Sequence, residues 1–283
     1  MSTQRETVVV IGAGGRMGQR VSANLATSPY QALYCETSAT GIERVNAAGR
    51  TVTAAATAVP QADVVVLATP DTVLGQVSHD VVPLMRDGTV LLTLDPAAAY
   101  AGLLATRDGV TQAVAHPCHP SVFLERTSAE QWADTFGGVS APQDVVAAVA
   151  DAASQGRVEE VIRVIYSPVL DVHWVTVKQL AVLEPTLVET VACMVGTLLK
   201  DALAETVHTV GIPEPAARAM LYGHVQIALT NALRGSHAFS EACEIAIAYG
   251  RETIIKDDWK RIFDDGELDR VITRMLRLEP STQ

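Results

Sequence analysis

The 283-residue sequence is poor in the features that mark several large protein classes. Its four cysteines form no C-x-x-C pair, which excludes a zinc ribbon and gives no disulfide framework. It has 21 basic residues against 32 acidic ones and no basic run, so nucleic acid is not an expected partner. No apolar run reaches the roughly 18 residues of a membrane span, and residues 1–6 are too polar for a signal peptide. We therefore expect a cytoplasmic protein with reduced thiols and no membrane partner.

What the sequence does contain is a glycine cluster between a β-branched run (8–11) and a helix-compatible segment (19–27). Glycines in this context let the backbone approach a diphosphate, which the N-terminus of the following helix attracts. The spacing fits the start of G-x-G-x-x-G and also G-x-x-G-x-x-G, and a plain tight turn is the alternative. The predicted cofactor-binding residues of this turn are Gly12, Gly14, Gly15, Arg16, Met17 and Gly18.

Glu36 ends the next predicted strand (31–36). An acidic side chain at this spacing can accept hydrogen bonds from both hydroxyls of the adenine ribose and would repel a 2′-phosphate. Glu36 therefore predicts NAD rather than NADP as the cofactor. The alternative is that Glu36 is an exposed loop glutamate without a role in binding. Asp71 follows the predicted strand 61–70, where backbone at a carboxyl strand end can touch the cofactor, although a simple strand-ending turn would look the same.

Strands and helices alternate through the first half, which predicts a doubly wound, mainly parallel Rossmann sheet over residues 1–168. With 48% apolar residues the chain can bury a substantial core. Besides the elements above, the expected strands are 88–95, 109–115, 136–141 and 158–165, and the expected helices are 41–48, 74–85 and 143–153.

His116 and His119 are each followed by proline, in a loop that leaves the predicted strand 109–115. Proline stiffens such a loop and fixes the direction of its side chains. Imidazoles placed there can bind a metal, hold a carboxylate or transfer protons, so both histidines are predicted catalytic residues.

The second half, residues 169–283, has a helical period and predicts an all-α domain. The expected helices are 174–210, 216–233, 239–249 and 267–278, with an amphipathic segment at 254–263 capping the bundle. Pro185 should kink or divide the first of them. Helix faces this apolar are typical of a subunit interface, so we expect a homodimer.

Three charged residues lie in the first half of the first of these helices: Lys178, Glu184 and Glu189. Lys178 and Glu189 share one face at 100° per residue, and Glu184 lies off that face unless Pro185 shifts the register. The neighbours of both glutamates are mostly apolar, and a carboxylate in such surroundings needs a partner. We therefore predict a site role for Lys178 and for one of the two glutamates.

Several motifs resemble a known family. GAGGRMG (12–18) and DVVVLATPD (63–71), followed by an all-helical half, look like the 6-phosphogluconate dehydrogenase-like superfamily. LDPAAAYAG (94–102), AHPCHP (115–120) and LEPTLVET (183–190) more closely resemble the D-apionate oxidoisomerases.

The resemblance implies a branched sugar acid as substrate, which NAD oxidises at C2 before a hydroxymethyl group migrates from C3 to C2. It also implies a divalent metal, with His116 and Glu184 or Glu189 as its ligands, and Lys178 as the counterpart of the superfamily's catalytic lysine. Val182 is a departure, because sugar-acid dehydrogenases of the superfamily carry asparagine four residues after that lysine. This departure counts against a standard 3-hydroxyacid dehydrogenase mechanism.

Three alternatives stay open at this point. A simple 3-hydroxyacid dehydrogenase would leave the carbon skeleton unchanged. Dihydrodipicolinate reductases share a turn like GAGGRMG, but their second domain is a sheet with a His-His-x-x-Lys signature that this sequence lacks. A regulator that binds NAD without turnover would leave the two histidines and the embedded glutamates without a role.

Overall fold

The computed structural model describes residues 5–278. Its contacts divide the chain into two compact units. Unit 1 contains the residues up to Leu183 and those from Asp269 onward, and unit 2 is Glu184–Leu268. The boundary predicted from the sequence lies at residue 168 instead. The two divisions differ because β7 and α8, which follow residue 168, continue the sheet and pack against it.

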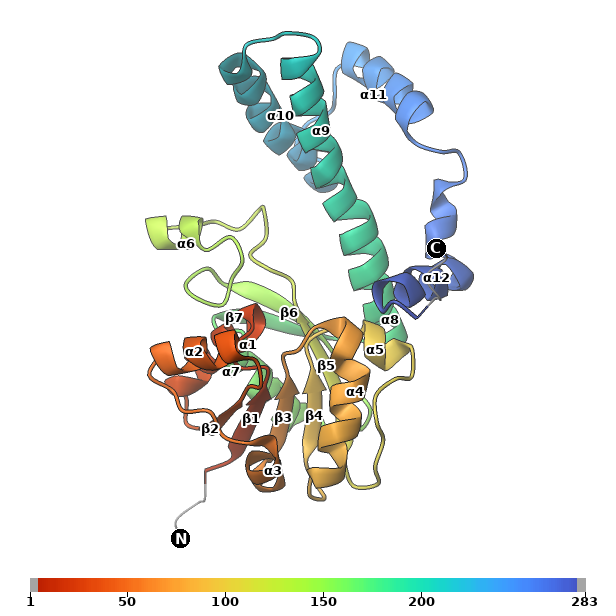
Figure 1. Cartoon of the computed structure of the whole chain (residues 1–283). Helices are drawn as coiled ribbons and strands as arrows, with labels where there is room; N and C mark the ends of the chain where they lie inside the picture. Colours follow the sequence, from red (N-terminus) through yellow and green to blue (C-terminus); the bar gives the residue numbers. More distant parts are fainter. Residues whose placement is uncertain (1–4, 279–283) are drawn as a thin grey trace. The chain divides into compact units, whose positions relative to one another are not determined.

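Unit 1 is built on a seven-stranded sheet with the order β2-β1-β3-β4-β5-β6-β7 (Figure 1). All neighbouring strands are parallel except β5 and β6, which confirms the predicted doubly wound, mainly parallel sheet. The chain moves outward in one direction from β1 to β2 and in the other from β1 to β3, so the carboxyl ends of β1 and β3 form the switch point where such sheets bind ligands. The strands are β1 (Thr7–Ile11), β2 (Gln31–Cys35), β3 (Val64–Leu67), β4 (Val90–Thr93), β5 (Thr111–Pro117), β6 (Gln143–Val149) and β7 (Val169–Trp174).

Helices cover both faces of this sheet. Its α-helices are α1 (Arg16–Ala26), α2 (Ala39–Ala47), α3 (Ala55–Ala58), α4 (Asp71–Val81), α5 (Ala97–Tyr100), α6 (Ala129–Ala133), α7 (Gln155–Ile165) and α8 (Val177–Ala181). Short 3-10 segments are η1 (Val59–Gln61), η2 (Val82–Leu84) and η3 (Ala152–Ser154). Helix α12 (Asp265–Met275) begins in unit 2 and ends in unit 1.

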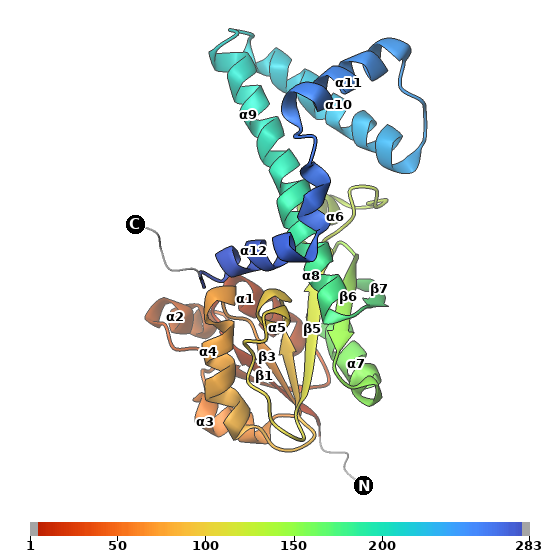
Figure 2. The same cartoon turned by 90° about the vertical axis from the view of Figure 1, so that its right-hand side faces the viewer.

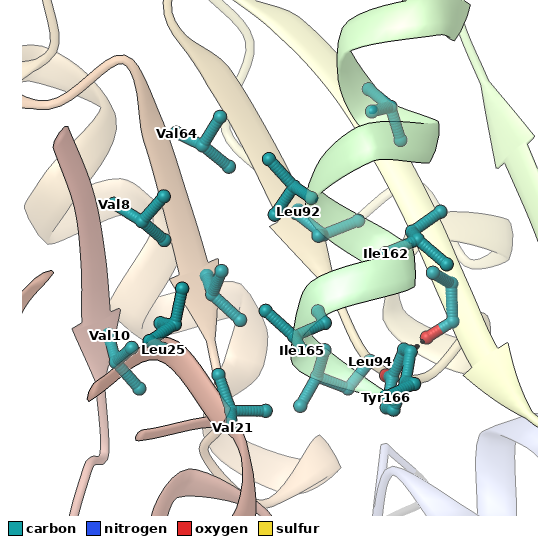
Figure 3. Close-up of a cluster of buried hydrophobic side chains, with 14 of the residues drawn as sticks. Val8, Val10, Val21, Leu25, Val64, Leu92, Leu94, Ile162, Ile165 and Tyr166 are labelled. Carbon is teal, nitrogen blue, oxygen red and sulfur yellow. Dashed lines mark hydrogen bonds between the residues drawn. The ribbon is translucent and has the colours of Figure 1, made fainter. Parts of the chain in front are cut away.

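Successive residues of the central strands feed two separate cores, as the period of two in a strand requires. Val8 and Val10 pack with α1 and α7 on one face, where Figure 3 shows Leu25 and Ile162 against the strands. Val9 lies in the other core, against α3, α4 and α5. The continuous apolar strand runs in the sequence are therefore explained by burial on both faces.

Three predicted elements between residues 136 and 165 are wrong. Residues 158–165 are part of helix α7, because Val158, Val161, Ile162 and Ile165 repeat at helical spacing and all face the core. Residues 143–149 form strand β6 rather than a helix, and 136–141 form an irregular loop in which Gly137 and Gly138 have positive φ. Strand β7 was missed altogether.

Unit 2 is helical, as expected, within the described residues. The helix from Val177 runs unbroken to His208, so of the two predicted effects of Pro185, a kink or a division, the division is wrong. Residues Val182–Cys193 instead form a π-helical segment, η4, whose wider turn accommodates the proline. The other elements are α9 (Met194–His208), α10 (Glu214–Arg234), α11 (Glu241–Ile254) and η5 (Trp259–Phe263). Helices α9 and α10 contact each other, and Figure 2 shows α10 diverging from α9 toward its carboxyl end.

Candidate active site

The glycine turn after β1 is held by close backbone contacts. Gly12 has a φ of 81°, which favours glycine, and a Cβ at Gly18 would lie 2.0 Å from the Gly12 carbonyl oxygen. Gly18 therefore supplies the close approach of helix and strand that the third glycine of a dinucleotide fingerprint provides. Helix α1 begins at Arg16, three residues earlier than predicted, so the turn leads directly into a helix N-terminus.

Glu36 lies beside this turn. Its Oε2 accepts a hydrogen bond from the Gly14 amide at 2.9 Å. Its Oε1 accepts from the amides of Thr37 and Ser38 at 2.9 and 3.0 Å. Burial raises the pKa of the Glu36 carboxyl, but these hydrogen bonds outweigh burial and leave the pKa below its ordinary value. An acceptor that is ionised at neutral pH thus lies next to the predicted diphosphate site, as the predicted ribose role requires.

A pocket of about 320 Å³ opens at the carboxyl ends of the central strands, next to the glycine turn. It joins residues from α1, the β3–α4 turn, the end of β4 and β5. Its lining consists of Gly15, Arg16, Met17, Leu67, Ala68, Thr69, Pro70, Asp71, Leu74, Leu94, Asp95 and His116. The structure therefore brings together the predicted residues Gly15, Arg16, Met17, Asp71 and His116.

His116 enters the pocket as a neutral base. Its Nδ1 lies 3.1 Å from the Leu94 carbonyl oxygen, which can only accept, so Nδ1 carries the proton and Nε2 the lone pair. Burial lowers the pKa of His116 to about 4. The imidazole is therefore uncharged near pH 7 and suited to bind a cation or to accept a hydrogen bond.

Asp95 lines the same pocket, although the sequence did not predict it. It follows β4, and its carboxylate and the His116 ring offer an oxygen and a nitrogen within 4.8 Å of each other. One Asp95 oxygen also accepts from the Ala97 amide at 2.8 Å, which orients the carboxylate. The signal that could have found it is its place at the end of a buried parallel strand.

Asp71 lies at the start of α4 and shares the pocket with Asp95. Burial, reinforced by the negative charge of Asp95, raises the pKa of Asp71 to about 6. Asp71 thus binds a proton in the folded protein over a pH range in which an unfolded chain has already released it.

We expect Asp71→Asn to stabilise the protein at pH 7.5 and not at pH 4. The ionisation of Asp71 costs folding free energy as pH rises from about 4 through about 6, and the full cost is present above that range. Asparagine keeps the shape without the charge, so Tm should rise by about 2–4 °C, after allowance for solvent screening. Asp80→Asn, an exposed position on the same helix, is the control. Equal Tm shifts at the two pH values would contradict the assignment.

The other predicted residues lie outside this pocket's lining. The His119 ring is 6.5 Å from the His116 ring, and its Nδ1 donates to the Phe136 carbonyl at 2.8 Å. Lys178 is exposed on α8. In unit 2, Glu184 is buried and Glu189 is exposed. Catalytic roles for His119 and Lys178, and metal roles for the glutamates, stay predictions.

The site combines a glycine turn that leads into a helix, an ionised acid beside that turn and a pocket at the sheet's switch point. These features define a Rossmann-type dinucleotide-binding oxidoreductase. Two family models agree with this class. "Acetohydroxy acid isomeroreductase, NADPH-binding domain" matches residues 2–128, and "Phosphogluconate dehydrogenase (decarboxylating) C-term" matches residues 124–276.

Related proteins identify the family to which this chain belongs within that class. A D-apionate oxidoisomerase from Pectobacterium atrosepticum is 58% identical over 281 residues, covering 99% of both chains. One from Blautia hydrogenotrophica is 41% identical over 95% of this chain and 96% of its own. The chain belongs to the D-apionate oxidoisomerase family, within the 6-phosphogluconate dehydrogenase-like superfamily. It is accordingly an enzyme that couples an oxidation to an isomerisation, as the resemblance of its motifs implied.

A solved structure agrees with the fold. The crystal structure described as a semialdehyde dehydrogenase NAD-binding protein from Cupriavidus necator, in complex with calcium and NAD, superposes with a TM-score of 0.92. The two sequences are 38% identical, and the match covers 96% of this chain and 100% of that one.

Proposed function

We propose that the enzyme oxidises D-apionate with NAD and rearranges the product to 3-oxo-isoapionate. The observation that carries the proposal is the pocket in which His116 and Asp95 lie beside the glycine turn. Relatives that bear this activity in their names match the whole chain at up to 58% identity. A simple dehydrogenase of a linear sugar acid is the second candidate, since the same turn would serve it.

The proposed reaction has two balanced steps. Hydride leaves C2 of the branched acid for NAD, the C2 hydroxyl loses its proton, and a 2-oxo acid results. The C3 hydroxyl then loses its proton while the hydroxymethyl group moves from C3 to C2 with its bonding electrons. C3 becomes a ketone, and the former C2 carbonyl oxygen takes up a proton. The second step needs a group near C3 that accepts a proton and a group that stabilises charge on the C2 oxygen.

NAD fits the residues present. The N-terminus of α1 offers open backbone amides after Gly15, and Glu36 is an ionised acceptor one strand away. Negative charge at Glu36 disfavours the 2′-phosphate of NADP. The nicotinamide would then reach the pocket lined by Asp71 and His116, where the sugar acid would bind.

A divalent cation also fits. Asp95 and His116 offer an oxygen and a nitrogen ligand, and the hydrogen bond from His116 Nδ1 to the Leu94 carbonyl fixes the ring in the way common for metal-bound histidine. Of the two glutamates that the resemblance implies, we propose Glu184 as a third ligand, because its side chain is buried and that of Glu189 is exposed. Such a cation would polarise the carbonyl of a chelating 2-oxo acid.

Chelation should therefore abolish the rearrangement. Dialysis against EDTA is expected to remove at least about 90% of the activity. One imidazole and two carboxylates bind a first-row cation reversibly, so the chelator can withdraw it. Mn²⁺ should restore it better than Ca²⁺, because calcium favours sites made only of oxygen. Elemental analysis before and after dialysis gives a readout independent of turnover. Full activity in protein free of metal would refute the metal site.

Product analysis tests the function itself. With D-apionate, one NADH should form per product molecule, and ¹³C NMR should show a ketone at C3 and a quaternary carbon at C2. A product that keeps the quaternary carbon at C3 would favour the simple dehydrogenase. NADH binding without turnover on any branched or linear aldonate would favour the regulator.

We also propose that the enzyme is a cytoplasmic homodimer formed through unit 2. Among the described hydrophobic side chains of unit 2, only Ala217 and Leu268 are buried. Helix α10 exposes Met220 and Ile227, which lie on one side of the helix, and Leu233, which lies on another. An isolated unit of this kind lacks a core of its own, and a second copy would supply one. The four cysteines are unpaired, in keeping with a reducing compartment.

The α9–α10 pair offers the docking surface. Two grooves of about 400 and 420 Å³ run along it, lined mostly by apolar side chains that include Leu199, Leu203 and Leu221. By length and composition the helix Val177–His208 could cross a membrane. Charges at Glu189 and Lys200 leave too short an uncharged stretch between them for that role, so we favour a second copy as the occupant.

Light scattering should give twice the 30.0 kDa chain mass. Leu221→Asp, which places a charge where the two grooves meet, should give the mass of a single chain at micromolar concentration. Val122→Asp, at an exposed apolar side chain of unit 1, should leave the mass unchanged. A single-chain mass for the unaltered protein would overturn the proposal.

A further inference from the structure

The carboxylate of Glu36 is held by more donors than a surface glutamate usually has. Oε1 accepts from the Thr37 amide, the Ser38 amide and the Ser38 hydroxyl, the last at 3.0 Å. Within residues 5–278, Oε2 accepts only from the Gly14 amide. A carboxylate oxygen has about two lone pairs, so Oε1 is saturated while Oε2 has room for one more donor.

Ser38 links this carboxylate to helix α2. It is the N-cap of α2, and its Oγ accepts from the Gly41 amide at 3.2 Å while donating to Glu36 Oε1. The hydroxyl thus cannot rotate away without leaving both a helix amide and the carboxylate without this partner. The rotamer of Glu36 is fixed by the N-terminus of α2.

Gly41 holds the same arrangement by its lack of a side chain. A Cβ at Gly41 would lie 2.4 Å from Glu36 Cδ and 2.6 Å from Ser38 Oγ. A Cβ at Gly14 would lie 2.4 Å from the Gly41 Cα atom. Helix α2 therefore contacts the diphosphate turn directly, backbone against backbone.

We propose that Ser38 and Gly41 are positioning residues for cofactor binding, which fix the Glu36 carboxylate so that Oε2 accepts a hydroxyl of the adenine ribose. The proposal rests on the proposed use of NAD. The sequence predicted that Glu36 accepts hydrogen bonds from both ribose hydroxyls. In the present proposal only one of its oxygens, Oε2, is open to the ribose. Ser38 and Gly41 act through Glu36 and need not touch the cofactor.

Ser38→Ala should weaken NADH binding about fivefold, which corresponds to the loss of one hydrogen bond to the carboxylate. The same factor should appear in KM for NAD, while kcat and KM for the sugar acid stay within twofold. Ser38→Thr keeps both the cap and the hydroxyl and should restore the affinity. Gly41→Ala should weaken NADH binding at least as much as Glu36→Ala does, because the added methyl group displaces the carboxylate.

Two comparisons separate this role from a structural one. Ser128 caps α6 in the same way, with its Oγ accepting from the Gln131 amide at 3.2 Å, so Ser128→Ala loses an equivalent cap. That variant should keep the affinity for NADH. A double-mutant cycle is the sharper test, because Ser38→Ala should have no further effect on NADH binding in a Glu36→Ala background.

Titration of NADH fluorescence with purified protein gives all these values without substrate. Additive effects of the two substitutions, or an unchanged affinity in Ser38→Ala when Glu36→Ala binds weakly, would overturn the positioning role alone. An unchanged affinity in Glu36→Ala would refute the ribose contact, and with it this part of the proposed function.

Discussion

Replacing His116 with alanine is expected to lower kcat at least about 1000-fold while the affinity for NADH stays within twofold. The imidazole lines the pocket next to Asp95, and its fixed tautomer presents a neutral lone pair at Nε2. The diphosphate turn and Glu36 lie on other elements and keep their contacts in the variant. Stopped-flow measurement of NADH formation, together with NADH titration, gives both quantities.

His173→Ala provides the matched control. This histidine is exposed on β7 and pairs with Asp144 at 3.1 Å, so its loss should leave kcat within twofold. Asp95→Asn should behave like His116→Ala if the two side chains share a cation, and its metal content should fall with its activity. Turnover near the normal rate in His116→Ala would remove this residue from the mechanism.

Gly18→Ala is expected to have the second large effect, a loss of NADH affinity of up to about 100-fold. The new methyl group would lie 2.0 Å from the Gly12 carbonyl oxygen, so α1 must move away from the turn. Overpacking of this kind costs about 1–3 kcal/mol, and the displacement falls on the helix N-terminus that would bind the diphosphate. Calorimetry or fluorescence titration with NADH measures the loss.

Gly156→Ala tests whether this effect belongs to the turn or to glycine in general. Gly156 also lies in the first turn of a helix, α7, but nothing lies within 4 Å of a Cβ built there. Alanine should therefore raise stability by about 0.5–1 kcal/mol and leave NADH affinity unchanged. If both variants lose affinity equally, the close contact at Gly18 is not the cause.

The sequence predicted the first half of the sheet because its strands are buried on both faces and read as continuous apolar runs such as 64–67. The strand prediction failed at 158–165, where a helix with apolar residues on one face is rich in valine and isoleucine. The β-branched residues of this segment favour a strand by local propensity, but packing of their shared face against the sheet stabilises a helix. Strand β7 was not predicted. It lies at the sheet edge, and none of its side chains is fully buried, so it has no clear alternation of buried and exposed residues.

The site divides in the same way. Glu36 and the glycines were predictable because spacing along one strand–turn–helix unit determines their place. Asp95 was not, because its proximity to His116 depends on β4 and β5 being neighbours in register, with Thr93 opposite Val114. Residues that are close in space but far apart in the sequence, such as Asp95 and His116, cannot be paired from sequence spacing. The fixed tautomer of His116 likewise depends on the Leu94 carbonyl, a contact across two strands.

The return of the chain to unit 1 has a consequence for biosynthesis. Ile272 and Leu276, from the end of the chain, are buried in unit 1, and Asp269 accepts a hydrogen bond from the Tyr100 hydroxyl at 2.8 Å. During translation, all of unit 2 leaves the ribosome before these residues do. Unit 1 therefore cannot be completed until the whole of unit 2 has been synthesised.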